Sequence, residues 1–540
     1  MKKTRHHSIW LIALIAAISL AGCQIANNEI EIEIDELVEL HAGRQRRVIF
    51  NNDGDEAWFT DAPATAEGFL SVRMDHIGHC GIDSVFFCNT HSFNLFTHNS
   101  EITEVFTDQT GQFQNNRTAA LIEQGTDTLK LAIEACRKRD IEIFWSLRMN
   151  DIHDSWTPQL VSKWKKDNPS MLMGLPYDAH LFPVSDPRSF WSFVDFSHKK
   201  VRDQIVAIVK DVLARYDVDG IDLDFLRHTC YFKETRLHQP VTFEHRAMLT
   251  DMVKQIHREV VMARRRKGKS ILLSARVLPS LSLNHRFGFE IEKWIDAGYL
   301  NLIVVGGGYD PFTMPSKQII ELSHRSGIPV YPCLSASGMY QRGVEGTDLH
   351  PHNIQAWRGA AANAWHSGAD GIVTFNLYPK LPEAFPTNHS RAVWADISKP
   401  HKLIDQDKLY CIENLVDSRK VGHMMRSVPW EDRLPATVER GKTIMRILPV
   451  ADDLSKLHDR VKTLRLRVCL DGGKGGEIVT IAVNGEEVPS VAENHGWLVA
   501  TLLPSTMKQG ENHVAVQYKQ GSADKLTITS IELTIQYHRS

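Results

Sequence analysis

The segment Asp217–His228, which reads DVDGIDLDFLRH, holds the acidic residues best placed to do chemistry. If it is a strand, alternate side chains point to opposite faces, so Asp222 and Asp224 share one face and Ile221 and Leu223 the other. Two carboxylates in a protein interior are costly unless they are paired or used, and their repulsion raises the pKa of one of them. Such a pair would suit acid catalysis. A structural pairing of Asp222 with an arginine is the alternative interpretation.

Two other segments carry polar residues with the same alternation. In SLRMND, Ser146, Arg148 and Asn150 fall on one face, and in LSARV, Ser274 and Arg276 do the same. If these segments are the strands on either side of the acidic one, both arginines can reach its aspartates. The sequence therefore predicts a polar cluster spread over three adjacent strands.

Strand-like apolar runs alternate with helical segments over residues 45–404. The predicted strands are Val48–Asn51, Ser84–Asn89, Ile141–Asn150, Val218–Asp224, Ile271–Leu278, Leu302–Gly306, Val330–Leu334 and Gly371–Tyr378. The predicted helices include Thr118–Lys138, Lys200–Tyr216, His245–Arg266, Pro315–Ser326 and Asn353–Ser367. Eight strand–helix units predict an α/β fold, a (β/α)8 TIM barrel. A doubly wound open sheet is the rival, and no GxGxxG motif follows the first strand to support it.

Residues 405–540 have a different pattern, without helices. Alternating segments, such as Thr463–Leu470 and Leu526–Tyr537, are separated by turns rich in glycine, including Asn484-Gly485. This predicts an all-β sandwich domain. Binding of sugar and bracing of the barrel are both open as its role, and Trp497 is the one aromatic residue that suggests a sugar platform.

Catalytic side chains of a TIM barrel come from the carboxyl ends of its strands and the loops that follow them. These places carry acids, amides, histidines and aromatic rings: Asp53, Trp58, His91, Asp151, His153, Asp154, Trp156, His228, Asp310, Asn376 and Tyr378. Acids for catalysis, amides for hydroxyl groups and rings for stacking are what a sugar site needs. We therefore expect a saccharide site at the barrel mouth.

The N-terminus has the order of a secretory signal. Lys2 and Lys3 precede an apolar run, which ends in Leu20-Ala21-Gly22-Cys23. This ending resembles the bacterial lipobox, which implies a signal peptide over residues 1–22, lipid attachment at Cys23, and anchoring to the cell envelope. Gln24 favours the outer membrane. Residues 23–44 are expected to be a tether, in which Glu29–Asp35 is either an edge strand or an acidic spacer.

The composition of the chain limits the classes of partner and cofactor that we expect. The formal net charge of −3 at pH 7 gives no reason to expect nucleic acid. No CxxC pair or HExxH helix is present, so the sequence predicts neither a metal site nor any other cofactor. The seven cysteines after Cys23 show no disulfide framework and are expected to be small core residues.

The segment Val201–Phe225, in which a helix leads into YDVDGI, resembles the family 10-like glycosyl hydrolase group, and the stretch Arg148–Asp151 resembles its exported members. The resemblance implies an O-glycosyl hydrolase with Asp224 as nucleophile, near Asp222. Asp310 is the first candidate for the acid, ahead of Asp151 and Asp154. The residues expected to hold substrate are Arg148, Asn150, Asp151, Arg276, Asn376, His228, Trp58 and Trp156. The chitinase signature DGxDxDxE does not carry over, because Leu226 replaces its glutamate.

Two other functions stay open. The first is a non-catalytic glycan-binding lipoprotein, which Leu226 and the poorly placed second acid favour. The second is a metal-dependent hydrolase with ligands among Asp53, His91, Asp222 and Asp224. If mutation of one aspartate abolishes turnover but leaves binding intact, the protein is a glycosidase and not a binding lipoprotein. If a chelator abolishes activity, the protein is a metal-dependent hydrolase.

Overall fold

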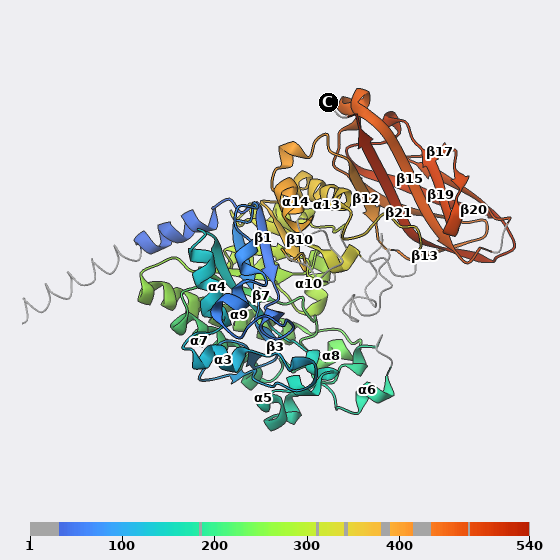
Figure 1. Cartoon of the computed structure of the whole chain (residues 1–540). Coiled ribbons are helices and arrows are strands. Elements are labelled where there is room, and N and C mark those ends of the chain that lie inside the picture. Colours follow the sequence, from blue (N-terminus) through green and yellow to red (C-terminus); the bar gives the residue numbers. More distant parts are fainter. Residues whose placement is uncertain are drawn as a thin grey trace, which may run out of the picture.

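Eight parallel strands close into a barrel in the computed structural model, which describes residues 32–182, 186–308, 313–339, 344–379, 389–413, 434–473 and 476–538 (Figure 1). The strands are β1 (Val48–Asn52), β2 (Ser84–Phe87), β6 (Glu142–Arg148), β7 (Gly220–Asp224), β8 (Leu272–Val277), β9 (Leu302–Val305), β10 (Val330–Ser335) and β11 (Ile372–Phe375). Each predicted strand is present, and the closed order excludes the doubly wound sheet. The TIM barrel is confirmed.

Helices follow the strands around the barrel. They include α4 (Thr128–Arg137), α7 (Lys199–Arg215), α9 (Phe243–Lys267), α10 (Leu281–Phe287), α11 (Ile291–Asp296), α12 (Lys317–His324), α13 (Ile354–His366) and α14 (His389–Ile397). The predicted helix Thr118–Lys138 is two helices, α3 (Thr118–Glu123) and α4. The chain turns between them at Gly125, whose φ is 79°, and Asp127 then caps α4 by accepting a hydrogen bond from the Lys130 N–H.

A helix over residues 32–42 closes the amino-terminal end of the barrel. Its Ile34 and Val38 are buried in the same apolar cluster as Ile49, Phe86 and Phe144 of the strands. The edge strand considered for Glu29–Asp35 is therefore wrong for the described residues 32–35. The predicted signal peptide over residues 1–22 and the predicted lipid site Cys23 lie outside the described residues.

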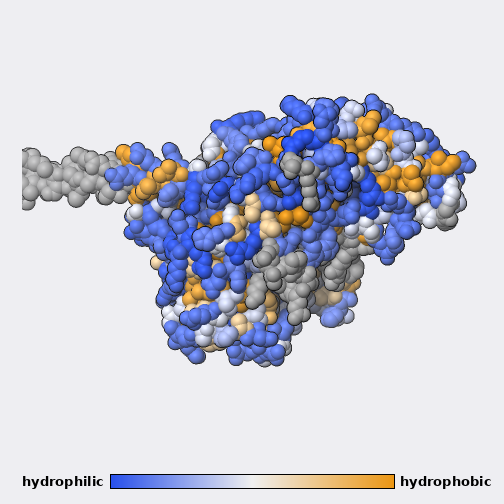
Figure 2. All heavy atoms as spheres, turned by 45° about the horizontal axis from the view of Figure 1, so that its top comes forward, coloured by the Kyte–Doolittle hydropathy of each residue, from blue (hydrophilic) through white to orange (hydrophobic). Residues whose placement is uncertain are grey.

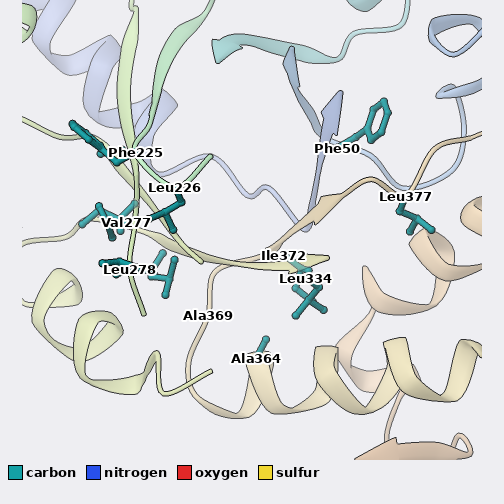
Figure 3. Packing of buried hydrophobic residues seen from close by; sticks show 14 of the residues in the cluster. Phe50, Phe225, Leu226, Val277, Leu278, Leu334, Ala364, Ala369, Ile372 and Leu377 are labelled. Atoms are coloured by element: carbon teal, nitrogen blue, oxygen red, sulfur yellow. The ribbon is translucent and has the colours of Figure 1, made fainter. Parts of the chain in front are cut away.

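The outer faces of the strands pack under the helices. Figure 3 shows Phe225, Val277 and Leu278 together at the ends of β7 and β8, and Ala364 of α13 near Leu334. Because Phe225, Val277 and Leu334 continue the outer faces of their strands, the alternate residues of the same strands point into the barrel. The predicted division of the strand-four segment between two faces is confirmed.

The C-terminal region consists of antiparallel sheets (Figure 1). One sheet contains β12 (Lys408–Ile412), β13 (Ala436–Glu439), β15 (Val461–Asp471), β18 (Val491–Ala492), β19 (Trp497–Thr501) and β21 (Lys525–Tyr537). The other contains β14 (Thr443–Val450), β16 (Ile478–Val483), β17 (Glu486–Val488) and β20 (Gly510–Gln520). Apolar residues of both sheets, such as Leu466 and Val516, belong to one buried cluster, as in a sandwich.

The C-terminal sheets contact the barrel through α13 and the loop that follows β10. Trp497 is only 1% exposed, and its Nε1–H donates to the carbonyl of Glu345 in that loop at 2.7 Å. The Arg467 guanidinium lies over its ring, 4.0 Å from the centroid. Trp497 therefore braces the two parts and is not available as a sugar platform.

The surface seen in Figure 2 is mainly hydrophilic, with apolar areas on the C-terminal sheets and near the helix over residues 32–42. The seven cysteines among the described residues are all buried and free, as expected of core residues. Within the same part of the chain, no helix is both long and apolar enough to cross a membrane.

Candidate active site

Two layers of polar side chains fill the upper half of the barrel around β7. In the strand register, Asp222 pairs with Ser146 and Ser274, and Asp224 pairs with Arg148 and Arg276. The predicted cluster on three adjacent strands is present. The lower layer lies inside the barrel and the upper layer lies at its mouth.

Asp222 is closed off in the lower layer. It accepts hydrogen bonds from Ser146 Oγ at 2.7 Å, from Ser274 Oγ at 3.1 Å and from Arg276 Nη2 at 3.0 Å. Burial raises its pKa, the Arg276 charge opposes this rise, and the neighbouring Asp224 adds to it. With no exposed surface and every contact internal, Asp222 has the geometry of the structural pairing considered from the sequence.

Asp224 is the less enclosed of the two aspartates. Its side chain is 4% exposed, and its Oδ1 accepts the Leu226 N–H at 3.0 Å. Arg276 Nε lies 3.9 Å from the same oxygen. Among the described residues no donor reaches Oδ2 of Asp224, and Nε and Nη1 of the buried Arg276 have no hydrogen-bond partner. The site thus has one carboxylate oxygen of Asp224 and two donor nitrogens of Arg276 that make no hydrogen bond within the described residues.

Arg148 contacts different acids from those predicted. Its Nη2 lies 2.9 Å from Asp53 at the end of β1, and its Nη1 donates to Asp151 Oδ2 at 3.0 Å. Of the two arginines, Arg276 alone contacts the strand-four aspartates in the described structure. The expectation that both arginines do so was wrong for Arg148, because its guanidinium is taken up by Asp53 after β1 and by Asp151 after its own strand.

A closed ring of polar contacts surrounds the mouth. The Asp151 carboxylate lies 2.6 Å from His153 Nδ1, and His153 Nε2 lies 3.1 Å from Arg227 Nη2. Arg227 in turn lies 3.9 Å from Asp53. Arg148 closes the ring, because it contacts both Asp53 and Asp151. Burial works against ionisation of both acids. Even so, the charges of Arg148 and Arg227 hold the pKa of Asp53 well below its usual range. His153 and Arg148 lower the pKa of Asp151 in the same way. Both acids are therefore anions at neutral pH.

Gly54 lets the chain turn away directly after Asp53. Its φ is 66°, and a side chain there would meet the carbonyl of Cys88 at 1.9 Å. Glycine is therefore required where the end of β1 passes β2. The turn leaves the Asp53 carboxylate in the mouth, next to Arg148.

Aromatic rings form a wall beside this ring of contacts. Trp156 is 54% exposed and packs edge-on against His153, His228 and Phe190. An exposed indole at the mouth of a barrel is suited to stacking on a sugar ring. Burial lowers the pKa of His228, and its Nδ1 has no partner among the described residues. Trp58 is more enclosed and packs edge-on against His91.

Two predicted site residues serve the scaffold. Asn150 donates to the carbonyls of Val194 and Cys230 and accepts the Val194 N–H, so its amide ties two loops together. Asp154 is buried against Lys165 at 2.8 Å and accepts a hydrogen bond from Ser192. The polar alternation of the sequence does not show that these side chains are already satisfied.

Asn376 and Tyr378 stand at the end of β11. The Tyr378 hydroxyl donates to Asn376 Oδ1 at 2.8 Å, and the guanidinium of Arg73 lies 3.5 Å above the Tyr378 ring. Asp310 falls outside the described residues. Arg73 and Arg227 were missed by the sequence analysis. Arg227 follows the end of β7 closely, which is a weak signal, whereas Arg73 lies far along the chain from β1 and has no such signal.

Within the described chain, one group of potential metal ligands gathers at the mouth, formed by Asp151, His153 and His228. Arg148 and the His153 ring already occupy the Asp151 carboxylate, and Arg227 meets the other ring nitrogen. An ion would have to displace these contacts. Asp53 and Asp222, considered as ligands from the sequence, are likewise occupied by arginines.

Residues 89–258, from the end of β2 into α9, match the family model described as glycosyl hydrolase-like 10. This segment carries the glycosyl hydrolase-like 10 pattern. The resemblance seen in the sequence is thus confirmed, and the matched part contains Arg148, Asp151, Asp224 and Arg227. The match supports a carbohydrate-active function. No curated protein matches the chain.

Three solved structures illustrate the wider comparison. A cycloisomaltooligosaccharide glucanotransferase of Paenibacillus sp. is 11% identical with a TM-score of 0.33, over 90% of this chain and 57% of that one. An α-amylase of Geobacillus thermoleovorans is 11% identical with a TM-score of 0.37, over 88% of this chain and 99% of that one. A GH36 α-galactosidase of Geobacillus stearothermophilus is 13% identical with a TM-score of 0.35, over 92% of this chain and 56% of that one. The chain thus spans a little over half the length of the first of these. At such scores the likeness carries no argument about the site.

Proposed function

We propose that the barrel hydrolyses glycosidic bonds of a poly- or oligosaccharide, with Asp224 as the nucleophile. The observation that carries this proposal is the Oδ2 oxygen of Asp224, which no donor in the described residues contacts, at the carboxyl end of β7 within the family-matched segment. Catalytic residues of TIM barrels come from this end of the strands.

In the proposed reaction, Asp224 attacks the anomeric carbon while a second acid protonates the leaving oxygen. The glycosidic C–O bond breaks and an ester to Asp224 forms, which water then hydrolyses. Asp310 stays the first candidate for the acid. Asp53, held as an anion by two arginines, suits electrostatic stabilisation of the positive charge that develops on the sugar ring. Trp156 supplies a stacking surface, and Arg276 supplies N–H donors.

The experiment compares turnover of a polysaccharide panel by the protein without residues 1–23 and by its Asp224→Asn variant. We expect the truncated wild type to release sugar. The Asp224→Asn variant should still bind the polysaccharide, but its turnover should fall about 10³-fold or more. The matched control is Asp195→Asn, since Asp195 caps the Ser197 N–H in a loop outside the ring. Equal turnover by Asp224→Asn and the wild type would refute the assignment.

A non-catalytic glycan-binding protein is the second candidate. The observation in its favour is that Asp53, Asp151, Asp154 and Asp222 are all buried and paired, so that none of these four acids offers a free proton donor beside Asp224. Binding of one glycan by wild type and variant alike, with no cleavage by either, would establish this alternative.

We also propose that the protein is exported and anchored by a lipid on Cys23, so that its substrate lies outside the cytoplasm. The support is the order of charged, apolar and small residues in the sequence. Cell fractionation tests this: the wild type should partition with outer membranes, and Cys23→Ser should not. Wild-type protein in the cytoplasm would refute it.

A further inference from the structure

A cavity of about 440 Å³ opens beside the barrel mouth, between the loop after β7 and the helix after β8. Its walls include Thr235 of α8 (Lys233–Arg236), Val241, Arg246 at the start of α9, and Phe287 of α10. Figure 1 shows α8 and α10 on this side of the barrel. Both connections follow carboxyl ends of barrel strands, so the cavity opens on the face that carries Asp224.

The lining of this cavity is cationic. Arg246 and Arg286 contribute guanidinium groups, His238 and His285 contribute imidazoles, and no aspartate or glutamate is among the described residues that line it. No carboxylate among these lining residues neutralises Arg246. An anionic group that entered would meet fixed positive charge and N–H donors.

Two buried polar atoms of the lining have no partner. These are Thr235 Oγ1 and Arg246 Nε, each shielded from solvent and without a hydrogen bond in the described structure. Arg246 Nη1 donates to the Val241 carbonyl at 3.0 Å, which fixes the side chain in the wall. Buried donors without partners are costly, so a fixed pair of them beside an open cavity indicates a ligand that supplies the acceptor.

Apolar surface completes the site. Val241 and Phe287 are buried residues that line the cavity beside the cations. A pocket with apolar walls and a few fixed polar groups is typical of a small-molecule site, and a ring face such as that of Phe287 suits a sugar. An inorganic anion has no apolar surface that could pack against these walls.

We propose that this cavity is a subsite for an acidic sugar, which it binds through a carboxylate or sulfate group against Arg246 and Thr235. This inference rests on the proposed function, because it identifies the substrate as an anionic glycan whose reacting unit lies at Asp224. The cavity would hold a neighbouring unit and select chains with negative charge.

The test is a ligand-observed NMR titration of the full chain with glucuronic acid, glucose 6-sulfate and glucose. We expect binding of one or both acidic sugars, weakened by added salt, and at least tenfold weaker binding of glucose. Arg246→Gln should lower affinity for the acidic sugar about tenfold and Thr235→Val a few-fold, while Arg246→Lys should recover part of the loss. Arg258→Gln, an exposed arginine on the same helix, is the matched control and should bind like the wild type.

Three results would overturn the inference: no binding of either acidic sugar, equal binding of glucose, or equal effects of Arg246→Gln and Arg258→Gln. Asp224→Asn separates this inference from the proposed function, because it should bind acidic sugars like the wild type. Turnover without anion binding refutes the subsite alone, and anion binding without turnover refutes the hydrolase alone.

Discussion

The guanidinium of Arg148 lies 2.9 Å from the carboxylate of Asp53, although their strands, β6 and β1, are separated in the barrel by β2. The contact therefore passes over β2 instead of following the strand pairing. Both groups are buried, and the same arginine also holds Asp151. A buried cation shared by two carboxylates fixes the position of both, and this makes the mouth a rigid frame around Asp224.

Replacement of Arg148 by methionine should destabilise the protein strongly. The variant would leave Asp53 and Asp151 without their shared cation, and removal of one partner from a buried ion pair costs about 3–5 kcal/mol. The pKa of Asp53 should rise, because burial would act with less opposition. Urea unfolding at pH 7 measures the first effect. The control is Arg137→Met, which breaks a pair with Asp219 whose arginine is 39% exposed and should cost less than about 1 kcal/mol. Similar losses in the two variants would contradict the shared-cation interpretation.

The barrel and the faces of its strands could be predicted because they depend on a period of two along each strand. This period places Asp222 and Asp224 inside and Leu223 outside, and the register then puts Arg276 beside them. The order of strands and helices likewise predicts the parallel arrangement.

The partners across the mouth could not be predicted in this way. Arg148 meets Asp53 and Arg227 meets His153 through diagonals set by barrel geometry and loop shape, which leave no period in the sequence. For the same reason Asn150 seemed free to bind substrate, whereas its amide is taken up by loop carbonyls that arrive from residues 194 and 230.

His98 should make the protein less stable as the pH falls from neutrality. It is buried beside Asn89 and Trp145, and burial lowers its pKa from 6.5 to about 3. Below about pH 6.5 the unfolded chain binds a proton that the folded protein excludes, so the stabilisation is complete above that pH and is lost towards pH 3. From pH 7 to pH 5 the loss is about 2 kcal/mol.

Urea unfolding of His98→Gln at the two pH values checks this. The variant should lose about 2 kcal/mol less than the wild type over the same interval. His401→Gln, at an exposed position, should keep the wild-type dependence. A pH dependence unchanged by His98→Gln would show that the folded protein does not lower the pKa of His98 relative to the unfolded chain.

Removal of divalent metal ions should leave turnover and thermal stability unchanged. Asp151, His153 and His228 lie close enough for a metal site. However, His153 uses Nδ1 towards Asp151 and Nε2 towards Arg227, which leaves its ring no lone pair for an ion. Dialysis against EDTA, followed by activity and melting measurements, tests this. An activity that is lost and then restored by Zn²⁺ would favour the metal-dependent hydrolase.

Arg467 on β15 should hold the C-terminal sheets to the barrel. Its Nη1 lies 2.6 Å from Asp348 and 3.1 Å from the fully buried Glu532, and its Nη2 donates to the Gly346 carbonyl at 2.6 Å. Arg467→Met would leave Glu532 buried without its cation, at a cost of about 3 kcal/mol. The effect should appear in urea unfolding and as faster proteolysis between the barrel and the sheets.

Arg465 provides the matched control on the same strand. It pairs with Glu493 at 2.6 Å, but both side chains are more than a third exposed, so Arg465→Met should cost less than about 1 kcal/mol. If Arg465→Met and Arg467→Met destabilise the protein equally, the contact with the loop after β10 is not what attaches the sheets. A larger loss for Arg467→Met would mean that the C-terminal region braces this loop, and through it the rim of the barrel mouth.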